Sequence, residues 1–360
     1  MDKEQNKEEQ AAKYRLHYFH RKDIPQLTAQ ELEEESALVY NKLMQVTQQT
    51  PKVKRMWLPA AAAAAVLILA AAVFLYYPSQ KEVIPVKTEH AVVNDALPGK
   101  HTATLKLANG NSILLSEAID GKIAEQSGVT ISKTKDNLLV YKTNNNNPNP
   151  AEYNTISTTN GQEYSVILPD GSRIWLNAAS SIKYPATFAA TKERIVELSG
   201  EAYFEIAKDA AHPFIVKTIG QEIKVLGTHF NVNSYADEAV TKTTLVEGSV
   251  QISCVNKVML KPGQQAVSNK NVVKVSKANV AETVAWKNGD FIFDNESLPS
   301  ILRQVARWYD VEIIDQANHK DIHLTGTVSR AKKLSTVLNS LARISNLKFD
   351  IKDQKVTVSD

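Results

Sequence analysis

Residues 194–207, RIVELSGEAYFEIA, are the stretch that decides the fold. Apolar and polar residues alternate through most of it, as in a strand with one face on a core, and Gly200 stands where a turn or bulge is expected. Similar segments follow at close intervals: 214–218, 221–227, 229–235, 241–253, 257–267 and 271–276. Many short strands without helices between them predict a β sandwich, a barrel or a solenoid-like β fold.

Two earlier stretches share one spacing. LANGNSILL (107–115) and LPDGSRIWL (168–176) both follow the pattern Leu-x-Asn/Asp-Gly-x-x-Ile-x-Leu. Each places a hairpin-type Asn-Gly or Asp-Gly pair between two apolar strands, which predicts a repeated hairpin. Between them NNNNPNP (144–150) is of low complexity and favours a loop.

From about Trp286 the pattern changes. Strand-like segments 290–295, 311–315, 322–329, 347–351 and 355–359 alternate with two helix-like segments, SLPSILRQVARWY (297–309) and KLSTVLNSLARIS (333–345). The apolar residues at helical spacing are Leu298, Ile301, Leu302 and Val305 in the first helix, and Leu334, Val337, Leu338 and Leu341 in the second. Two tandem β-α-β units predict a separate α+β domain.

An uncharged apolar run extends from Trp57 to Tyr77. As a helix its 21 residues would be about 31 Å long, close to the thickness of a hydrocarbon core of about 30 Å. Lys52, Lys54 and Arg55 precede it and only Lys81 lies close after it, so the positive-inside rule predicts a cytoplasmic N-terminus. A cleaved signal peptide and a buried core helix are the two alternatives, and the late start of the run and its lack of a polar face weigh against them.

Before this run, residues 25–46 have the pattern of an amphipathic helix. Thr28 and Glu31 have capping-box spacing. One face then carries an apolar stripe, formed by Leu32, Val39, Tyr40, Leu43 and Val46. A partner protein that covers the stripe by helix-in-groove contact is one interpretation, and a small closed bundle without a partner is the other.

Composition excludes several classes of function. The formal net charge of +3 gives no basis for nucleic-acid binding, and a single cysteine, Cys254, rules out an intrachain disulfide and a multi-cysteine metal site. A buried strand position suits Cys254 better than a reactive thiol. The histidines lack metal-ligand spacing, so neither a metal nor a cofactor is expected. The sequence predicts no enzyme, because it has no nucleophile elbow, phosphate loop or zincin motif.

Two pairs of a glycine and a glutamate, and two tryptophans, are further candidates for a site. The pairs Gly200–Glu201 and Glu247–Gly248 are typical of strands and turns, although two carboxylates that meet in space could act as in a glycosidase. Trp175 and Trp308 are interpreted as core residues rather than as platforms for a ligand.

Five blocks in chain order resemble the FecR family of membrane-anchored anti-sigma factors. They are VILPDGSRIWLNAASSIKYP, RIVELSGEAYFEIAKDAAHPFIVKT, VLGTHFNVNSY, TTLVEGSVQI and LKPGQQA. Residues 286–313, WKNGDFIFDNESLPSILRQVARWYDVEI, are similar to the C-terminal domain that accompanies this family in Bacteroidetes. The resemblance covers roughly residues 155–360. The C-terminal domain of these proteins is similar to the short N-terminal domain of secretins and TonB-dependent transducers.

The resemblance implies a protein of the inner membrane that regulates transcription and controls the uptake of iron or of carbohydrate. A cytoplasmic segment holds an extracytoplasmic-function sigma factor, a TonB-dependent outer-membrane transducer signals from the periplasm, and a protease acting within the membrane is a further implied partner. The apolar stripe around Leu43 would bind the sigma factor. The alternative is a membrane-anchored periplasmic binding or scaffolding protein, and an anchored enzyme is the third.

The fold class expected is thus multi-domain: a short α-helical cytoplasmic segment, one transmembrane helix, an all-β periplasmic domain and an α+β C-terminal domain of tandem β-α-β units. The expected parts are a sigma-binding segment at 1–56, the transmembrane helix at 57–77, a periplasmic tether at 78–100, a FecR-like β domain at 101–285 and a signalling domain at 286–360.

Overall fold

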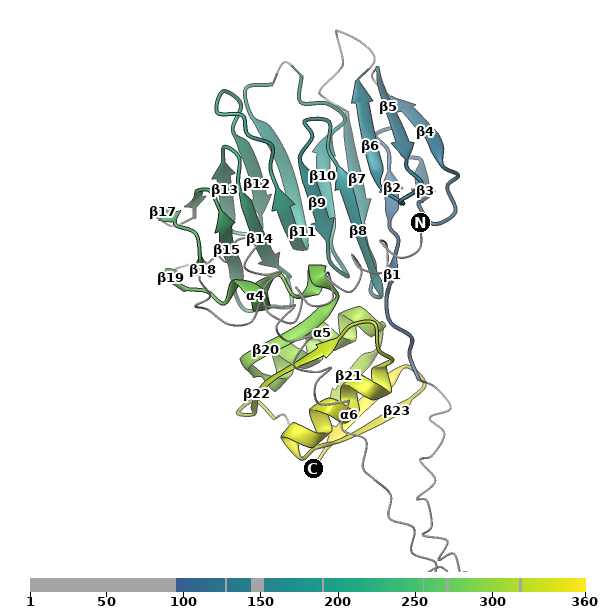
Figure 1. The fold of residues 1–360 in the computed structure, drawn as a ribbon, viewed down its shortest axis with the longest axis vertical. Coiled ribbons are helices and arrows are strands. Elements are labelled where there is room, and N and C mark those ends of the chain that lie inside the picture. Colours follow the sequence, from purple (N-terminus) through teal and green to yellow (C-terminus); the bar gives the residue numbers. More distant parts are fainter. Residues whose placement is uncertain are drawn as a thin grey trace, which may run out of the picture. The chain divides into compact units, whose positions relative to one another are not determined.

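The structure is a computed structural model, and it describes residues 95–126, 128–143, 152–189, 191–254, 256–269, 272–316 and 319–360. All of these belong to one compact unit, Lys87–Asp360. The described part consists of a large β region, β1 to β19, followed by a smaller region of helices and strands (Figure 1).

Nineteen strands of the β region are connected by hydrogen-bonded pairing. The first nine are β1 (Lys100–His101), β2 (Thr104–Lys106), β3 (Ser112–Leu114), β4 (Gly121–Gln126), β5 (Val129–Lys133), β6 (Leu139–Thr143), β7 (Tyr153–Ser157), β8 (Gln162–Ile167) and β9 (Arg173–Leu176). The others are β10 (Ser181–Pro185), β11 (Arg194–Glu205), β12 (Phe214–Thr218), β13 (Gln221–Val225), β14 (His229–Ser234), β15 (Thr241–Glu247), β16 (Val250–Ser253), β17 (Lys257–Leu260), β18 (Gln264–Ser268) and β19 (Val273–Lys277).

The pairings form two sheets over one core. In the first sheet the order is β3-β2-β7-β10-β11-β12-β13-β16-β17. In the second it is β4-β5-β6-β8-β9-β11-β14-β15-β18-β19. The buried apolar side chains of both sheets make a single cluster, so the β region is a two-layer sandwich.

The strand β11 belongs to both sheets. Its first half, from Arg194, pairs with β10 and β12, and its second half, from Gly200, pairs with β9 and β14. Gly200 lies at the bend with a φ of +89°, and a Cβ atom there would come within 2.4 Å of the Ser180 hydroxyl oxygen. Glycine at this position therefore allows one strand to turn from one layer into the other.

Both hairpins predicted from the repeated spacing are present. The Leu107 N–H donates to the carbonyl oxygen of Asn111 at 2.8 Å, between β2 and β3. The Leu168 N–H donates to that of Ser172 at 2.8 Å, between β8 and β9. Gly110 and Gly171 both have a positive φ, as such turns require.

The C-terminal region has its own apolar core. Its elements are α4 (Val280–Thr283), the short 3₁₀ helix η1 (Trp286–Asn288), β20 (Asp290–Ser297), α5 (Leu298–Tyr309), β21 (Glu312–Asp315), β22 (His323–Ser329), α6 (Leu334–Ser345), β23 (Lys348–Lys352) and β24 (Lys355–Ser359). The predicted apolar faces of α5 and α6 are buried in this core.

The strands of this region pair differently from two β-α-β units. β20 pairs antiparallel with β22, while β21 pairs parallel with β24, which also pairs antiparallel with β23. The elements thus have the predicted order but form two small sheets (Figure 1). An alternating apolar pattern shows that a segment is a strand, but it does not specify the neighbouring strand.

The fold class predicted from the sequence is wrong for the part of the chain that the structure describes. That part is mostly β, with the three α-helices α4, α5 and α6. Within the described ranges, no helix combines the length and the apolar character that crossing a membrane requires. The segments predicted as a cytoplasmic helix (25–46) and as a membrane span (57–77) lie outside those ranges. The domain boundaries stay predictions.

Candidate functional site

The outer face of the second sheet carries a cluster of polar and aromatic side chains. On β11, Ala202 and Phe204 face the core, so Glu201 and Tyr203 face the opposite side. Tyr203 pairs with Trp175 on β9 and with Asn231 on β14. Glu201 is nevertheless only 9% exposed, because the C-terminal region covers this face. We call the contacts that the C-terminal region makes with this face and with the loop between β14 and β15 the polar junction.

Glu201 is at the centre of a chain of hydrogen bonds. The side-chain amides of Asn177 and Asn231 donate to its two carboxylate oxygens at 2.8 and 2.9 Å. The oxygen of Asn231 accepts from the Trp286 indole N–H at 3.2 Å, and that of Asn177 accepts from the Arg330 guanidinium at 3.0 Å. The Trp286 indole and the Arg330 guanidinium can only donate, so each asparagine turns its oxygen toward them and its NH₂ toward Glu201. Both oxygens of Glu201 must therefore accept.

Two effects oppose each other at this carboxyl group. Burial raises the pKa of Glu201, and the hydrogen bonds from Asn231 and Asn177 and the charges of Arg307 and Arg330 act against that rise. The polarity of the hydrogen-bond chain suits the ionised group. A protonated carboxyl group would place its O–H against an amide donor and so weaken one of the two links to the C-terminal region.

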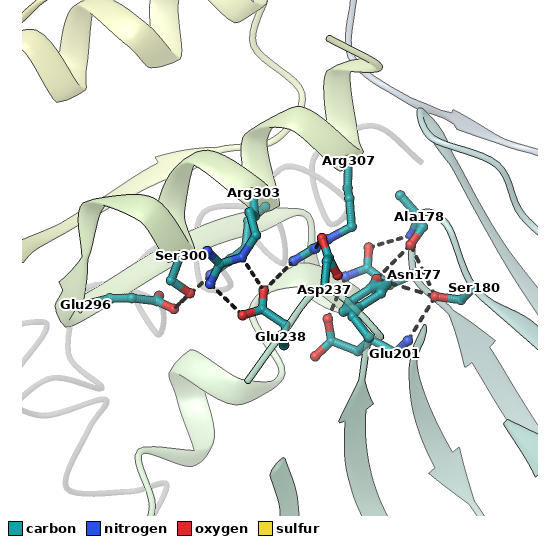
Figure 2. A network of polar contacts seen from close by, with 12 residues as sticks. Asn177, Ala178, Ser180, Glu201, Asp237, Glu238, Glu296, Ser300, Arg303 and Arg307 are labelled. Atoms are coloured by element: carbon teal, nitrogen blue, oxygen red, sulfur yellow. Dashed lines mark hydrogen bonds and ion pairs between the residues drawn. The ribbon is translucent and has the colours of Figure 1, made fainter. Parts of the chain in front are cut away.

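Helix α5 contributes two arginines to the junction (Figure 2). Arg303 donates to both carboxylate oxygens of Glu238 at 3.0 and 2.6 Å. Arg307 donates to Glu238 at 3.0 Å and to Asp237 at 2.9 Å, and its guanidinium lies 3.9 Å from the ring centre of Tyr235. Burial favours a higher pKa for Glu238, but the two arginines outweigh burial and hold this pKa below its usual value.

A third arginine joins the junction to the C-terminal core. The Arg330 side chain is 3% exposed, and its guanidinium stacks 3.7 Å from the ring centre of Trp308. It donates to the carbonyl oxygen of Trp286 at 2.7 Å and lies 3.6 Å from a Glu163 carboxylate oxygen. Burial lowers the pKa of Arg330, and the charge of Glu163 opposes that effect. Burial likewise raises the pKa of Glu163, against the charge of Arg330.

Trp175 lies at one side of the junction and is half-buried. The Arg173 guanidinium and the Lys287 ammonium each lie 4.5 Å from its ring centre. Trp175 belongs to neither of the two apolar cores, and its ring lies against these two cations instead. The prediction that Trp175 is a core residue is therefore wrong, whereas Trp308, 6% exposed, belongs to the C-terminal core as predicted.

Beside these contacts is a polar cleft of about 320 Å³. Its wall includes Asn177, Glu201 and Trp286, and Glu282, Asp294 and Glu296 also line it. Burial raises the pKa of Glu282 to about 7, and repulsion from Glu296 and Asp294 adds to the rise. The cleft therefore contains a carboxyl group that titrates near neutral pH.

The junction is made of ion pairs and hydrogen bonds between groups that water can also satisfy. Opening it would expose charged and amide groups together with the rings of Tyr235 and Trp286, which is less apolar surface than breaking a core would expose. Each region has its own apolar core, and among the described residues of the β region only Ala178 is buried in the C-terminal core. Two regions joined in this way can change their mutual contacts without unfolding.

The sequence-predicted site residues Leu32, Val39, Tyr40, Leu43 and Val46 lie outside the described residues, so the sigma-binding stripe stays a prediction. Cys254 follows β16 and is partly buried against the sandwich core. In the described ranges, no group of three or more His, Cys, Asp or Glu side chains could hold a metal ion.

The carboxylates of Glu201 and Glu247, the two glutamates of the Gly/Glu pairs, do not meet. Glu201 is opposite Asn233 on β14 and Glu247 is opposite His229. These two positions on β14 are four residues apart, or about 13 Å along a strand. Glu201 was considered only as a candidate carboxylate, and the sequence analysis did not predict its partners Asn177 and Asn231, although all three lie within the quoted resemblance blocks. The available signal was the charged residue Glu201 directly before the apolar residues Ala202, Tyr203 and Phe204.

Two family models match the chain: "FecR protein" over residues 154–251, and "FecR, C-terminal" over residues 290–358. Two similar crystal structures are each of a "putative anti-sigma factor" from Parabacteroides distasonis ATCC 8503. The first is 27% identical with a TM-score of 0.55 and covers 58% of this chain and 99% of its own; the second is 28% identical with a TM-score of 0.54 and covers 57% and 98%.

No curated protein matches the chain. Residues 154–251 include β11 and β14, and residues 290–358 include α5 and Arg330, so the polar junction connects the two matched regions. The chain therefore contains both a FecR domain and a FecR C-terminal domain.

Proposed function

We propose that this chain is an anti-sigma factor that relays a signal from its C-terminal domain to a sigma factor. The observation that carries the proposal is the polar junction, which joins the FecR domain to the FecR C-terminal domain through breakable contacts at Glu201 and Glu238. The anti-sigma description of the two structural neighbours supports the same role.

The finer assignment rests on the sequence. We propose that residues 1–56 bind an extracytoplasmic-function sigma factor in the cytoplasm through Leu32, Val39, Tyr40, Leu43 and Val46. The apolar run 57–77 anchors the chain in the inner membrane, and the described part is periplasmic. There the C-terminal domain receives the signal of a TonB-dependent outer-membrane transducer in the control of iron or carbohydrate uptake. The role requires no catalysis, cofactor or nucleic-acid contact.

In this mechanism the sigma factor is held at the membrane and kept from the polymerase. Docking of the transducer on the C-terminal domain favours a state with an altered junction, and in that state the cytoplasmic segment binds the sigma factor less tightly. The transducer can shift this equilibrium only by binding the two states unequally, so the junction contacts determine how large a signal is needed. Cleavage within the membrane completes the release.

Co-purification tests the proposal. The full chain, with an affinity tag, is isolated from membranes of the source organism, and co-purifying sigma factors are identified by mass spectrometry. The matched variant Val39→Asp/Leu43→Asp places two charges on the apolar stripe, and Gln48→Asp/Gln49→Asp places two charges beside it. We expect one sigma factor with the wild type and the control, and none with the stripe variant.

Absence of any sigma factor from all three preparations would contradict the proposal. It would favour the periplasmic binding or scaffolding protein, for which the polar cleft of about 320 Å³ is the supporting observation. Equal retention by the wild type and the stripe variant would keep the anti-sigma role but remove the assigned interface.

A further inference from the structure

The first turn of α6 receives its cap from a distant part of the chain. The residue before the helix, Lys333, makes no side-chain capping bond. Instead, the Leu334 N–H donates to the carbonyl oxygen of Ala96 at 3.0 Å. The Ser335 N–H donates to one carboxylate oxygen of Asp95 at 2.9 Å, and the Ser335 hydroxyl donates to the other at 2.7 Å. Residues about 240 positions earlier thus satisfy the first two N–H groups of this helix.

The same segment has a second attachment, to the core of the C-terminal domain. Gly99 lies against the ring of Trp308, where a Cβ atom would come within 2.6 to 2.8 Å of three ring carbons. Ala96 packs on the C-terminal core, whereas Leu97 is 65% exposed. We call residues 95–99 the strap, and of its residues only Leu97 is exposed.

The strap contacts the same groups as the polar junction. The Trp308 ring that touches Gly99 also carries the stacked guanidinium of Arg330, which donates to Asn177 and so reaches Glu201. Just after the strap, the Lys100 N–H donates to the carbonyl oxygen of Gly161 at 2.8 Å, and the Gly161 N–H donates to that of Arg307 at 2.7 Å. A shift of α5 or of Trp308 therefore acts on the strap and on the junction together.

We propose that the strap is a latch through which the C-terminal domain holds the segment leading to the membrane anchor. Asp95 and α6 are more than 230 residues apart in the sequence, but they are in direct contact through hydrogen bonds. A partner that moves the first turn of α6 or the Trp308 ring releases the strap, and by linkage a released strap favours binding of that partner. The latch gives the signal a route toward residues 78–94 that bypasses the β sandwich. This inference rests on the proposed function.

Hydrogen exchange tests the contact itself, on the full chain. The Ser335 amide is protected by Asp95, and replacement at residue 95 leaves the intrinsic exchange rate of residue 335 unchanged. We expect Asp95→Ala to raise the exchange rate of this amide about fivefold or more, from the loss of a cap. Asp95→Asn should stay close to the wild type, because an amide can accept from the Ser335 N–H and donate to its hydroxyl. Asp350→Asn, at an exposed position of β23, is the matched control.

Exchange at Ser335 that is the same in Asp95→Ala as in Asp350→Asn would overturn the latch. A rise in Asp95→Asn as large as in Asp95→Ala would also contradict the proposed geometry, because both hydrogen-bond partners of Ser335 can be kept by the asparagine.

Sigma-factor retention tests the regulatory role. In a Cys254→Ser chain, Asp95→Cys and Ser335→Cys place two thiols at side chains that now touch, so oxidation would lock the strap. We expect Asp95→Ala to retain severalfold less sigma factor than the wild type. In a chain whose junction is broken by Glu238→Ala, the oxidised double variant Asp95→Cys/Ser335→Cys should restore retention of the sigma factor. Each single-cysteine variant should not restore it.

Two outcomes distinguish failure of the latch from failure of the proposed function. If Asp95→Ala opens the strap by exchange and still retains sigma factor at the wild-type level, the latch is not regulatory and the anti-sigma function stands. If no variant and no wild-type chain retains a sigma factor, the proposed function falls, and the regulatory role of the latch falls with it.

Discussion

Replacing Glu238 by alanine removes three hydrogen bonds between the FecR domain and α5. Arg303 is 36% exposed and can return to water, so its share resembles a surface pair, about 0.5 kcal/mol. Arg307 is only 11% exposed, and the loss of its charged partner costs about 2 kcal/mol, although Asp237 remains. The total of about 2.5 kcal/mol corresponds to a fall in Tm of about 5 to 10 °C for a domain of this size.

The assay is thermal unfolding of the full chain in detergent, followed by tryptophan fluorescence, since Trp286 and Trp308 both lie at the junction. The matched control is Glu197→Ala on β11, where Glu197 and Lys183 are 3.3 Å apart and about half exposed. We expect a loss below about 1 kcal/mol for the control. Equal Tm values for Glu238→Ala and Glu197→Ala would show that Glu238 contributes no more than a surface ion pair.

The same variant has a defined pH dependence. The pKa of Glu238 is lowered in the fold, so its stabilisation is complete above the unfolded value of about 4.5 and is lost as pH falls through the folded value. The Tm difference between wild type and Glu238→Ala should therefore be constant near neutral pH and shrink in acid. A difference that grows as the pH falls would have the wrong sign for an ionised Glu238.

Three further predictions concern other parts of the unit. Glu201→Gln should be less damaging by about 1 kcal/mol in a Trp286→Phe background, because Asn231 can then turn its oxygen toward the glutamine; a double-mutant cycle of unfolding free energies without coupling would count against the hydrogen-bond polarity. The raised pKa of Glu282, about 7, means that its stabilisation is present below about pH 4.5 and lost as pH rises through 7; Glu282→Gln should flatten the Tm profile between pH 5 and 8, and an unchanged profile would contradict the assignment. Gly200→Ala should cost about 2 kcal/mol or more at the bend of β11, and a Tm within about 1 °C of the wild type would show that the bend tolerates a side chain.

Much of the local structure follows from sequence patterns. The apolar period of 297–309 predicts the buried face of α5, and the Asn-Gly and Asp-Gly pairs predict the turns before β3 and β9. These patterns work because burial of one face and a positive φ at glycine are local requirements. The strand order in the C-terminal region could not be predicted in the same way, because pairing partners are chosen by the whole packed domain.

The polar junction was harder to predict from the sequence, for a related reason. Glu201 has the alternation of a strand residue whose side chain faces away from the core, and such residues normally face water. Its burial depends on Trp286 and Arg330, which are 85 and 129 positions later in the chain. A sequence pattern of a few residues contains no information about such a partner, whereas the resemblance blocks do include Asn177, Glu201 and Asn231.

The relay itself is tested most directly by sigma-factor retention on a full-length chain in which only the junction is changed. We would measure the sigma factor that co-purifies from membranes with wild type, Glu238→Ala and the control Glu197→Ala, at equal amounts of chain. We expect severalfold less sigma factor with Glu238→Ala than with the other two, although residues 1–56 are identical in all three. Equal retention by all three, with the Tm of Glu238→Ala lowered as predicted, would contradict it.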